Sequence, residues 1–315
     1  MSKQKISTKL TKTIETTSEK TMYDESCKKI LSDKSILALI MKECITEYKN
    51  IETKEIIKHI EGNPVIGKTE FFTGKTIKGL TTEIIGNNNG KIFFDIRYRA
   101  TVPSANDMVE LIINIEAQND QYPGYPLVKR GIFYDCMMIT SQYGTEFDKL
   151  DYNKIKKVYS IWLCRNAPQK LSNSITAYEM NERNIIGNVK EKKENYDLLT
   201  VVMVHLGKAK SKQKSDLLNL LNRLFSEEIR AKEKLEILEK EYNISPNEDF
   251  EREVVQMCNW SKTVEDKGIA AGIEQGIEQG RVKERIEMAR KLILKGMPLA
   301  EISELMEIPI EQLTS

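Results

Sequence analysis

Two acidic residues, Asp95 and Glu116, lie in neighbouring stretches whose patterns predict the two strands of one β-hairpin. Asp95 belongs to IFFDIRYRATV and Glu116 to LIINIEAQ, and polar residues recur at every second position of each stretch, as on one face of a strand. The segment PSANDM between them is rich in turn-forming residues. In a hairpin that is symmetric about this segment, Val102 pairs with Val109 and Asp95 pairs with Glu116, with their Cβ atoms about 5 Å apart.

Two carboxylates at that separation repel each other unless a positive charge lies beside them. Arg97 and Arg99 share the face of Asp95 in the predicted strand, while Phe94 and Ile96 point to the other face. Salt bridges to these arginines are therefore one solution. A divalent cation is the other, because carboxylate oxygens suit Mg²⁺ or Mn²⁺. The alternation alone favours the salt-bridged hairpin with a solvated face, and the pattern leaves both interpretations open.

The segments around the hairpin predict an α/β core that would position these residues. SILALIMKEC begins a helix from residue 35 to about 48, and a short helix follows near 52–59. KKVYSIWLC and DLLTVVMVHL are short and almost wholly apolar, which is typical of strands covered on both faces. Before them, YPLVKRGIFYDCMMITSQYG has the apolar spacing of a helix, with prolines near its start. Strands mixed with long helices indicate an α/β fold.

The two ends of the chain have different patterns. Residues 1–28 are rich in Lys, Thr and Ser and lack apolar periodicity, so we expect a disordered tail before a domain of residues 29–206. Residues 207–263 are predicted to form a helical region. Residues 264–315 contain GIAAGIEQGIEQG, with a glycine at every fourth position, and then a small helical tail that resembles part of a helix-turn-helix. The glycines indicate either close helix–helix packing or a flexible connector.

Composition and charge narrow the function classes. The chain of 315 residues has a formal net charge of +1, so bulk charge selects no partner. Its five cysteines are scattered and include no CxxC pair, which disfavours a zinc site or a disulfide framework and favours a reducing cytoplasm. The first residues are too polar for a signal peptide, and no apolar run is long enough to cross a membrane.

A larger pattern joins these segments. A first helix, a strand with Asp, a hairpin, a strand with Glu-x-Gln and an immediate helix resemble the PD-(D/E)XK nuclease superfamily. More narrowly, they resemble its nuclease family transposases, relatives of the recombination-promoting nucleases. The resemblance rests on SILALIMKECITEYK, IFFDIRYRAT, IINIEAQ, YPLVKRGIFYDCMM, YNKIKKVYSIWLC and the tail around GIEQGIEQGRVKE, and covers residues 30–166 and 265–310. It implies a restriction-endonuclease-like mixed central sheet flanked by helices in residues 29–206, followed by an all-helical C-terminal extension.

The resemblance also implies a role for each residue of the hairpin end. Asp95 and Glu116 would ligate Mg²⁺ or Mn²⁺, with the backbone carbonyl of Ala117 as a further ligand. The metal would lower the pKa of a bound water and polarise the scissile phosphate. Gln118 stands where the superfamily usually has a lysine. Its amide can orient water or a phosphate oxygen, but it supplies no positive charge.

Residues on two helices complete the implied site. Glu47, in the first helix, resembles an additional acidic metal ligand, and Glu43, one turn away, is an alternative; a solvated helix face explains either equally well. Arg130 and Tyr134 lie four residues apart on the helix after the Glu-x-Gln strand, and with Lys129 they would contact DNA phosphates. Arg130 is equally suited to pair with an active-site carboxylate.

These observations predict a metal-dependent endonuclease that hydrolyses phosphodiester bonds of double-stranded DNA. Recombination or transposition is the process it would serve, and the helical C-terminal region would form a homodimer. One alternative is a catalytically weak or inactive DNA-binding or interaction protein that keeps the nuclease fold, which the missing lysine favours. Another is an α/β scaffold whose acidic pair is salt-bridged.

Overall fold

The chain forms two compact units in the computed structural model. The model describes residues 21–66, 83–85, 91–103, 108–118, 122–209, 212–306 and 308. The larger unit is Lys20–Trp260, and the smaller one comprises Met1–Glu19 and Ser261–Ser315.

A six-stranded mixed sheet forms the centre of the larger unit. Its strand order is β1-β4-β5-β6-β8-β7. The bounds of these strands are β1 Val65–Ile66, β4 Ile96–Pro103, β5 Met108–Gln118, β6 Lys157–Cys164, β7 Ser174–Glu179 and β8 Leu199–His205. Strands β5, β6 and β8 run parallel, whereas β1, β4 and β7 pair antiparallel with their neighbours. A separate two-stranded sheet joins β2 (Glu83–Ile85) to β3 (Lys91–Phe93).

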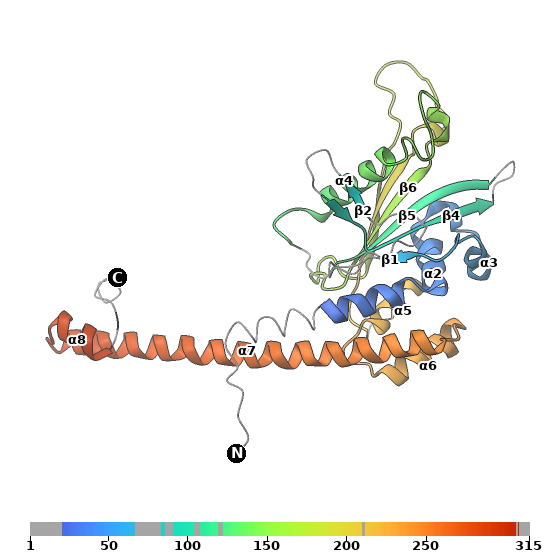
Figure 1. Cartoon of the computed structure of the whole chain (residues 1–315). Coiled ribbons are helices and arrows are strands. Elements are labelled where there is room, and N and C mark those ends of the chain that lie inside the picture. Colours follow the sequence, from blue (N-terminus) through green and yellow to red (C-terminus); the bar gives the residue numbers. More distant parts are fainter. Residues whose placement is uncertain are drawn as a thin grey trace. The chain divides into compact units, whose positions relative to one another are not determined.

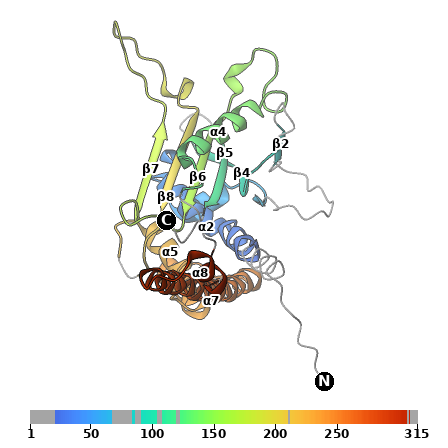
Figure 2. The same cartoon turned by 90° about the vertical axis from the view of Figure 1, so that its left-hand side faces the viewer.

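Helices cover both faces of the large sheet, which makes it the middle layer of an α/β fold (Figure 1). Helix α4 (Leu127–Thr140) connects the parallel strands β5 and β6 and packs on one face through Leu127, Tyr134 and Met138. Helices α2 (Lys34–Cys44) and α5 (Asp216–Leu224) lie on the opposite side, as Figure 2 shows. The coarse fold class expected from the sequence is confirmed: a mixed sheet flanked by helices.

The N-terminal boundary of this unit differs from the expected one. A helix covers residues 21–31, so residues 21–28 do not belong to a disordered tail. Cys27 and Ile30 on this helix are fully buried in the main hydrophobic core. Asp33 then caps α2 by accepting a hydrogen bond from the N–H of Ser35 at 2.8 Å. Two short helical segments follow, η1 (Thr46–Tyr48) and α3 (Thr53–Lys58).

The helices that follow the sheet belong to the same compact unit up to Trp260. Helix α6 is Ala231–Tyr242, and α7 is Glu248–Leu294. Leu217 and Leu221 of α5, Leu238 of α6 and Val254 of α7 are all buried in the core that also holds the apolar face of the sheet. The expected domain boundary at residue 206 therefore does not separate compact units, because the amphipathic helices need the sheet to bury their apolar faces.

The smaller unit is built on the second part of α7. This helix continues through the glycine repeat, and a Cβ atom added at Gly276 or Gly280 would meet nothing within 4 Å. Gly296, at φ +82°, follows the end of α7, and α8 (Leu299–Met306) begins after Pro298. Ala289, Ile302 and Ile308 form a small apolar cluster. The end of the expected helical tail, residues 309–315, lies outside the described residues.

None of the helices in the described part of the chain is both long enough and apolar enough to span a bilayer.

Candidate active site

The β4–β5 hairpin has the register predicted from its loop. Val102 pairs with Val109, and Ile96 pairs with Ile115, so the next position along brings Asp95 opposite Glu116. The N–H of Asp95 donates to Glu116 Oε1 at 3.0 Å, and the N–H of Ala117 donates to Asp95 Oδ2 at 2.9 Å. The two carboxylates therefore lie side by side, each held by the backbone of the other strand.

A bend in the chain at Asp95 changes which residues accompany it. Strand β3 ends at Phe93 and β4 begins at Ile96. Phe94 was predicted to share the face of Ile96, and this was wrong. Its ring packs against Tyr134 of α4, with centroids 5.2 Å apart, whereas Ile96 belongs to the core on the opposite face. The interruption of the strand breaks the period-2 alternation on which the prediction depended.

Helix α4 covers the face that holds Glu116. Glu116 is 4% exposed and Asn114 is fully buried, so this end of the hairpin is not the solvated face that the salt-bridged interpretation expected. Burial raises the pKa of Glu116 well above its ordinary value, and the neighbouring charge of Asp95 raises it further. The positive charge of Arg130 and a hydrogen bond from Asn114 act in the opposite direction.

A lysine that the sequence reading missed supplies the ion pair of Asp95. Lys28 Nζ lies 2.6 Å from Asp95 Oδ1, and the lysine side chain is only 12% exposed. Residue 28 was assigned to the tail, although Tyr23, Cys27, Ile30 and Leu31 recur at helical spacing just around it. That periodicity was the available signal for a helix carrying Lys28.

The two arginines expected to neutralise the acids have other partners. Arg99 forms an ion pair with Glu146, which Lys156 also contacts. Arg97 donates to Ser141 Oγ at 3.3 Å and lies over the Phe94 ring, 5.3 Å from its centroid. Burial, together with the charge of Arg99, lowers the pKa of Arg97 to about 10. The predicted salt bridges from these arginines to the acidic pair are replaced by the one from Lys28.

Helix α4 places Arg130 and the Tyr134 ring near Glu116, where the Trp162 ring of β6 also lies. Arg130 donates to the Tyr134 hydroxyl at 2.7 Å and to the Tyr125 hydroxyl at 3.3 Å. Its guanidinium also lies over the Trp162 ring, 5.3 Å from the centroid. Tyr134 is buried, whereas Lys129 is exposed to solvent. Of the residues expected to touch DNA, Lys129 is exposed, Arg130 is half-buried and Tyr134 is buried, and the Tyr134 hydroxyl accepts a hydrogen bond from Arg130.

Gln118 ends strand β5, two residues beyond Glu116. It pairs with Cys164 of β6, and its carbonyl oxygen accepts a hydrogen bond from the N–H of Arg165 at 3.0 Å. The alternation along β5 puts its side chain on the same face as that of Glu116, as predicted. Gln118 is partly exposed, so its side chain is accessible to solvent on this face of the sheet.

The structure separates Glu47 from the acidic pair. Glu47 lies in η1 rather than in the first helix, and its carboxylate accepts from the Tyr159 hydroxyl and pairs with Lys157 Nζ at 3.0 Å. Tyr159 belongs to the core on the sheet face opposite the α4 cluster. Glu47 therefore does not lie beside Asp95, and the prediction that it is a metal ligand there was wrong. Sequence could not show on which face of the sheet the residues after the first helix would lie.

The alternative acid, Glu43, caps a helix. Its carboxylate accepts hydrogen bonds from Ser215 Oγ and from the N–H of Leu217 at 2.9 Å. Both donors lie at the start of α5, where backbone N–H groups lack partners within the helix and the helix dipole favours a negative charge. Glu43 therefore has a structural partner and does not join Asp95 and Glu116.

The donors at the hairpin end fit a hard divalent cation. Asp95 Oδ1 already lies 2.6 Å from a positively charged ammonium, and burial raises the pKa of the neighbouring Glu116 despite the nearby charge of Arg130. Among the described residues, no group of three or more His, Cys, Asp or Glu side chains is arranged to hold a metal. Two carboxylates with water molecules are nevertheless a common ligand set for Mg²⁺.

Comparisons of the chain with protein-family models, with curated proteins and with solved structures found no match.

Proposed function

We propose that the protein is a metal-dependent DNA endonuclease of the PD-(D/E)XK transposase-like type, with a restriction-endonuclease-like fold in its larger unit. The observation that carries the proposal is the juxtaposition of Asp95 and Glu116, which hydrogen bonds of 3.0 and 2.9 Å hold at the end of the hairpin. A buried acid beside a second acid is unfavourable for stability, and such pairs recur at sites of function.

Four residues would carry the chemistry. Asp95 and Glu116 would hold Mg²⁺ or Mn²⁺, together with the backbone carbonyl of Ala117. The cation, when bound, would provide a nucleophilic hydroxide at neutral pH and a Lewis acid for the phosphate. Gln118 would orient the attacking water or a phosphate oxygen through its amide.

Helix α4 would form the flank that faces the DNA. Lys129 is exposed and would contact a phosphate, which positions the duplex without reading its sequence. Arg130 would act mainly as the counter-charge of Glu116, since its pKa is raised in part by that carboxylate and it already donates to Tyr134. Tyr134 would keep Arg130 directed at the site.

The wider biological role follows the same proposal. A nuclease of this type would serve recombination or transposition in the cytoplasm, where the free cysteines stay reduced. The second part of α7 and α8 would join two copies. Gly276 and Gly280 have open space around them in the single chain, which leaves room for a partner helix.

Plasmid nicking tests the proposal. Supercoiled plasmid is incubated with the protein and Mg²⁺ or Mn²⁺, and the wild type is compared with Asp95→Asn and with Asp151→Asn. Asp151 forms an ion pair with Lys154 on the surface and is a matched control. We expect metal-dependent nicking by the wild type and the control, and a loss of at least about 100-fold in Asp95→Asn. Equal nicking by all three would contradict the proposal.

The second candidate function is DNA binding without efficient cleavage. Gln118 supplies no charge, and Asp95 Oδ1 is occupied by the ammonium of Lys28. The two functions separate in Ca²⁺, which supports binding but is a poor cofactor for hydrolysis. DNA affinity in Ca²⁺ without nicking in Mg²⁺ or Mn²⁺ would favour the binding protein.

A further inference from the structure

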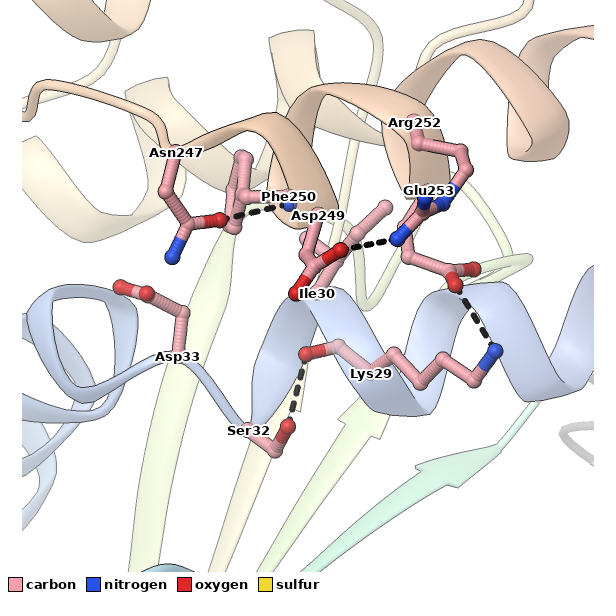
Figure 3. A pocket seen from close by; sticks show the side chains of 9 residues that line it. All are labelled: Lys29, Ile30, Ser32, Asp33, Asn247, Asp249, Phe250, Arg252 and Glu253. Carbon is pink, nitrogen blue, oxygen red and sulfur yellow. Dashed lines mark hydrogen bonds and ion pairs between the residues drawn. The ribbon is translucent and has the colours of Figure 1, made fainter.

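The helix that carries Lys28 is fixed at several points along its length. Asp24 forms an ion pair with Arg165 at 2.7 Å, and Arg165 also donates to Cys27 Sγ at 3.0 Å. On the other side, Lys29 Nζ lies 2.7 Å from Glu253 Oε1 of α7, and Figure 3 shows this lysine reaching across to that carboxylate. The backbone of residue 28 is therefore held by contacts that do not involve Lys28 itself.

Lys28 uses this placement to direct its side chain at the acidic pair. Its ammonium contacts Asp95 Oδ1 at 2.6 Å, while Asp95 Oδ2 accepts from the N–H of Ala117. Because Oδ2 accepts this backbone hydrogen bond, Oδ1 is the oxygen of Asp95 that can bind a cation. The long aliphatic stem of Lys28 lets the ammonium move by a few ångströms while the helix stays in place.

The chemistry proposed for this site needs such a group. A phosphodiester carries one negative charge, and further charge develops on its non-bridging oxygens when water adds to phosphorus. Gln118, at the end of β5, can donate a hydrogen bond but no charge. Arg130, on the opposite flank, already donates to Tyr134 and Tyr125.

We infer that Lys28 is a catalytic residue whose ammonium contacts a non-bridging oxygen of the scissile phosphodiester. In this role it would transfer from Asp95 Oδ1 to the phosphate when Asp95 turns that oxygen to a divalent cation. No proton is transferred to or from Lys28 in this step, so its contribution is electrostatic. The inference rests on the proposed nuclease function and adds to it the source of the missing positive charge.

Three variants test the inference. Lys28→Met removes the ammonium and keeps the aliphatic stem, whereas Lys28→Arg keeps the charge. Lys29→Ala is the matched control, because Lys29 is the next residue of the same helix and its ion pair has nearly the same length. For each variant we would measure Mn²⁺ affinity by electron paramagnetic resonance without DNA, duplex affinity in Ca²⁺ by fluorescence anisotropy, and nicking in Mg²⁺.

The expected results differ from those of a merely structural salt bridge. Lys28→Met should bind Mn²⁺ at least as tightly as the wild type, because a competitor for Asp95 is gone. Its nicking should fall by about 10²–10³-fold, and the salt slope of its duplex binding should shrink by about 0.9. Lys28→Arg should recover part of the nicking, and Lys29→Ala should stay within about twofold of the wild type, which is small beside a 10²-fold effect.

Two outcomes would overturn the inference. Nicking by Lys28→Met at the level of Lys29→Ala would show that the charge is not used. If Lys28→Met lost both its Mn²⁺ affinity and its nicking activity, Lys28 would only position Asp95. In both cases the wild type still nicks, so the nuclease proposal stands. A wild type that neither binds nor nicks DNA would remove both proposals. Circular dichroism of Lys28→Met checks that the loss of nicking is not a loss of folding.

Discussion

Asp95 and Glu116 are joined crosswise through the backbone of the hairpin that carries them. The N–H of Asp95 donates to the carboxylate of Glu116 at 3.0 Å, while the carboxylate of Asp95 accepts from the N–H of Ala117 at 2.9 Å. The backbone thus holds together two groups whose charges repel, and burial of Glu116 increases the electrostatic cost.

Glu116→Gln should therefore separate stability from activity. The amide oxygen can still accept the hydrogen bond from Asp95, and the charge conflict disappears. We expect a variant as stable as the wild type or more stable, by about 0.5–2 kcal/mol in urea unfolding. Its nicking activity should fall by at least about 100-fold, because a metal ligand is lost. A strongly destabilised variant would show instead that the ionised carboxylate supports the fold.

Asp135 of α4 gives a pH-dependent prediction. It is fully buried, and neither carboxylate oxygen has a hydrogen-bond partner among the described residues. Burial raises its pKa well above the ordinary value. Below the unfolded-state pKa of about 3.9, the carboxyl is protonated in both states and does not destabilise the fold. As the pH rises towards the raised folded-state pKa, the free energy of unfolding falls, because the unfolded state loses this proton more readily than the folded state.

Asp135→Asn removes this titration. We expect the variant to gain stability relative to the wild type as the pH rises from about 4 to about 7, by about 1–3 kcal/mol when an unpaired buried charge is avoided. Urea unfolding at both pH values measures it. Asp197 is the control, because it is also buried but pairs with Lys157 at 2.7 Å. Asp197→Asn should lose stability at about pH 7; an equal response of both variants would contradict the prediction.

The sequence predicted those features that depend on local pattern. A hairpin symmetric about the sequence PSANDM predicts the pairing of Val102 with Val109, and the helical spacing of the apolar residues after β5 predicts α4. Features that depend on tertiary packing were missed. Phe94 lies on the opposite face from Ile96 because the strand is interrupted by a bend, and Glu47 contacts Tyr159 on the face of the sheet away from α4. Neither a strand interruption nor the packing of a helix on a sheet produces a periodic pattern in the sequence.

The sequence predicted the acidic residues of the candidate site but not the cationic residue that pairs with them. The paired positions of Asp95 and Glu116 followed from the hairpin register, whereas Lys28 lies 67 residues before Asp95 in the chain and reaches it only through tertiary contacts. The helix at residues 21–31 was not predicted, because the sequence before residue 28 is mostly polar and the helix has few buried positions. Arg97 and Arg99 were nearer in sequence but found partners elsewhere.

Gly131 sets the distance between α4 and the sheet, and an alanine there should be harmful. A Cβ atom at this position would lie 2.5 Å from Val201 Cγ1 and 3.0 Å from Trp162 Nε1. Although alanine favours a helix by about 1 kcal/mol, we expect Gly131→Ala to lose about 1–3 kcal/mol of stability from overpacking. Gly276→Ala, whose added Cβ meets nothing in the single chain, should gain about 1 kcal/mol in the monomer. Thermal unfolding by circular dichroism compares them, and stabilisation by both would show that α4 can move outward freely.

Glu47→Gln should have the opposite profile to Glu116→Gln. The substitution removes the ion pair with Lys157, which is 11% exposed, and weakens the contact with the Tyr159 hydroxyl. We expect a loss of about 1–3 kcal/mol in urea unfolding, because partly buried polar groups lose a charged partner. Nicking per folded molecule and its dependence on Mg²⁺ concentration should remain as in the wild type, since Glu47 lies on the far face of the sheet from Glu116. A higher Mg²⁺ requirement in Glu47→Gln, with unchanged stability, would return Glu47 to the metal site and contradict the arrangement of the two faces.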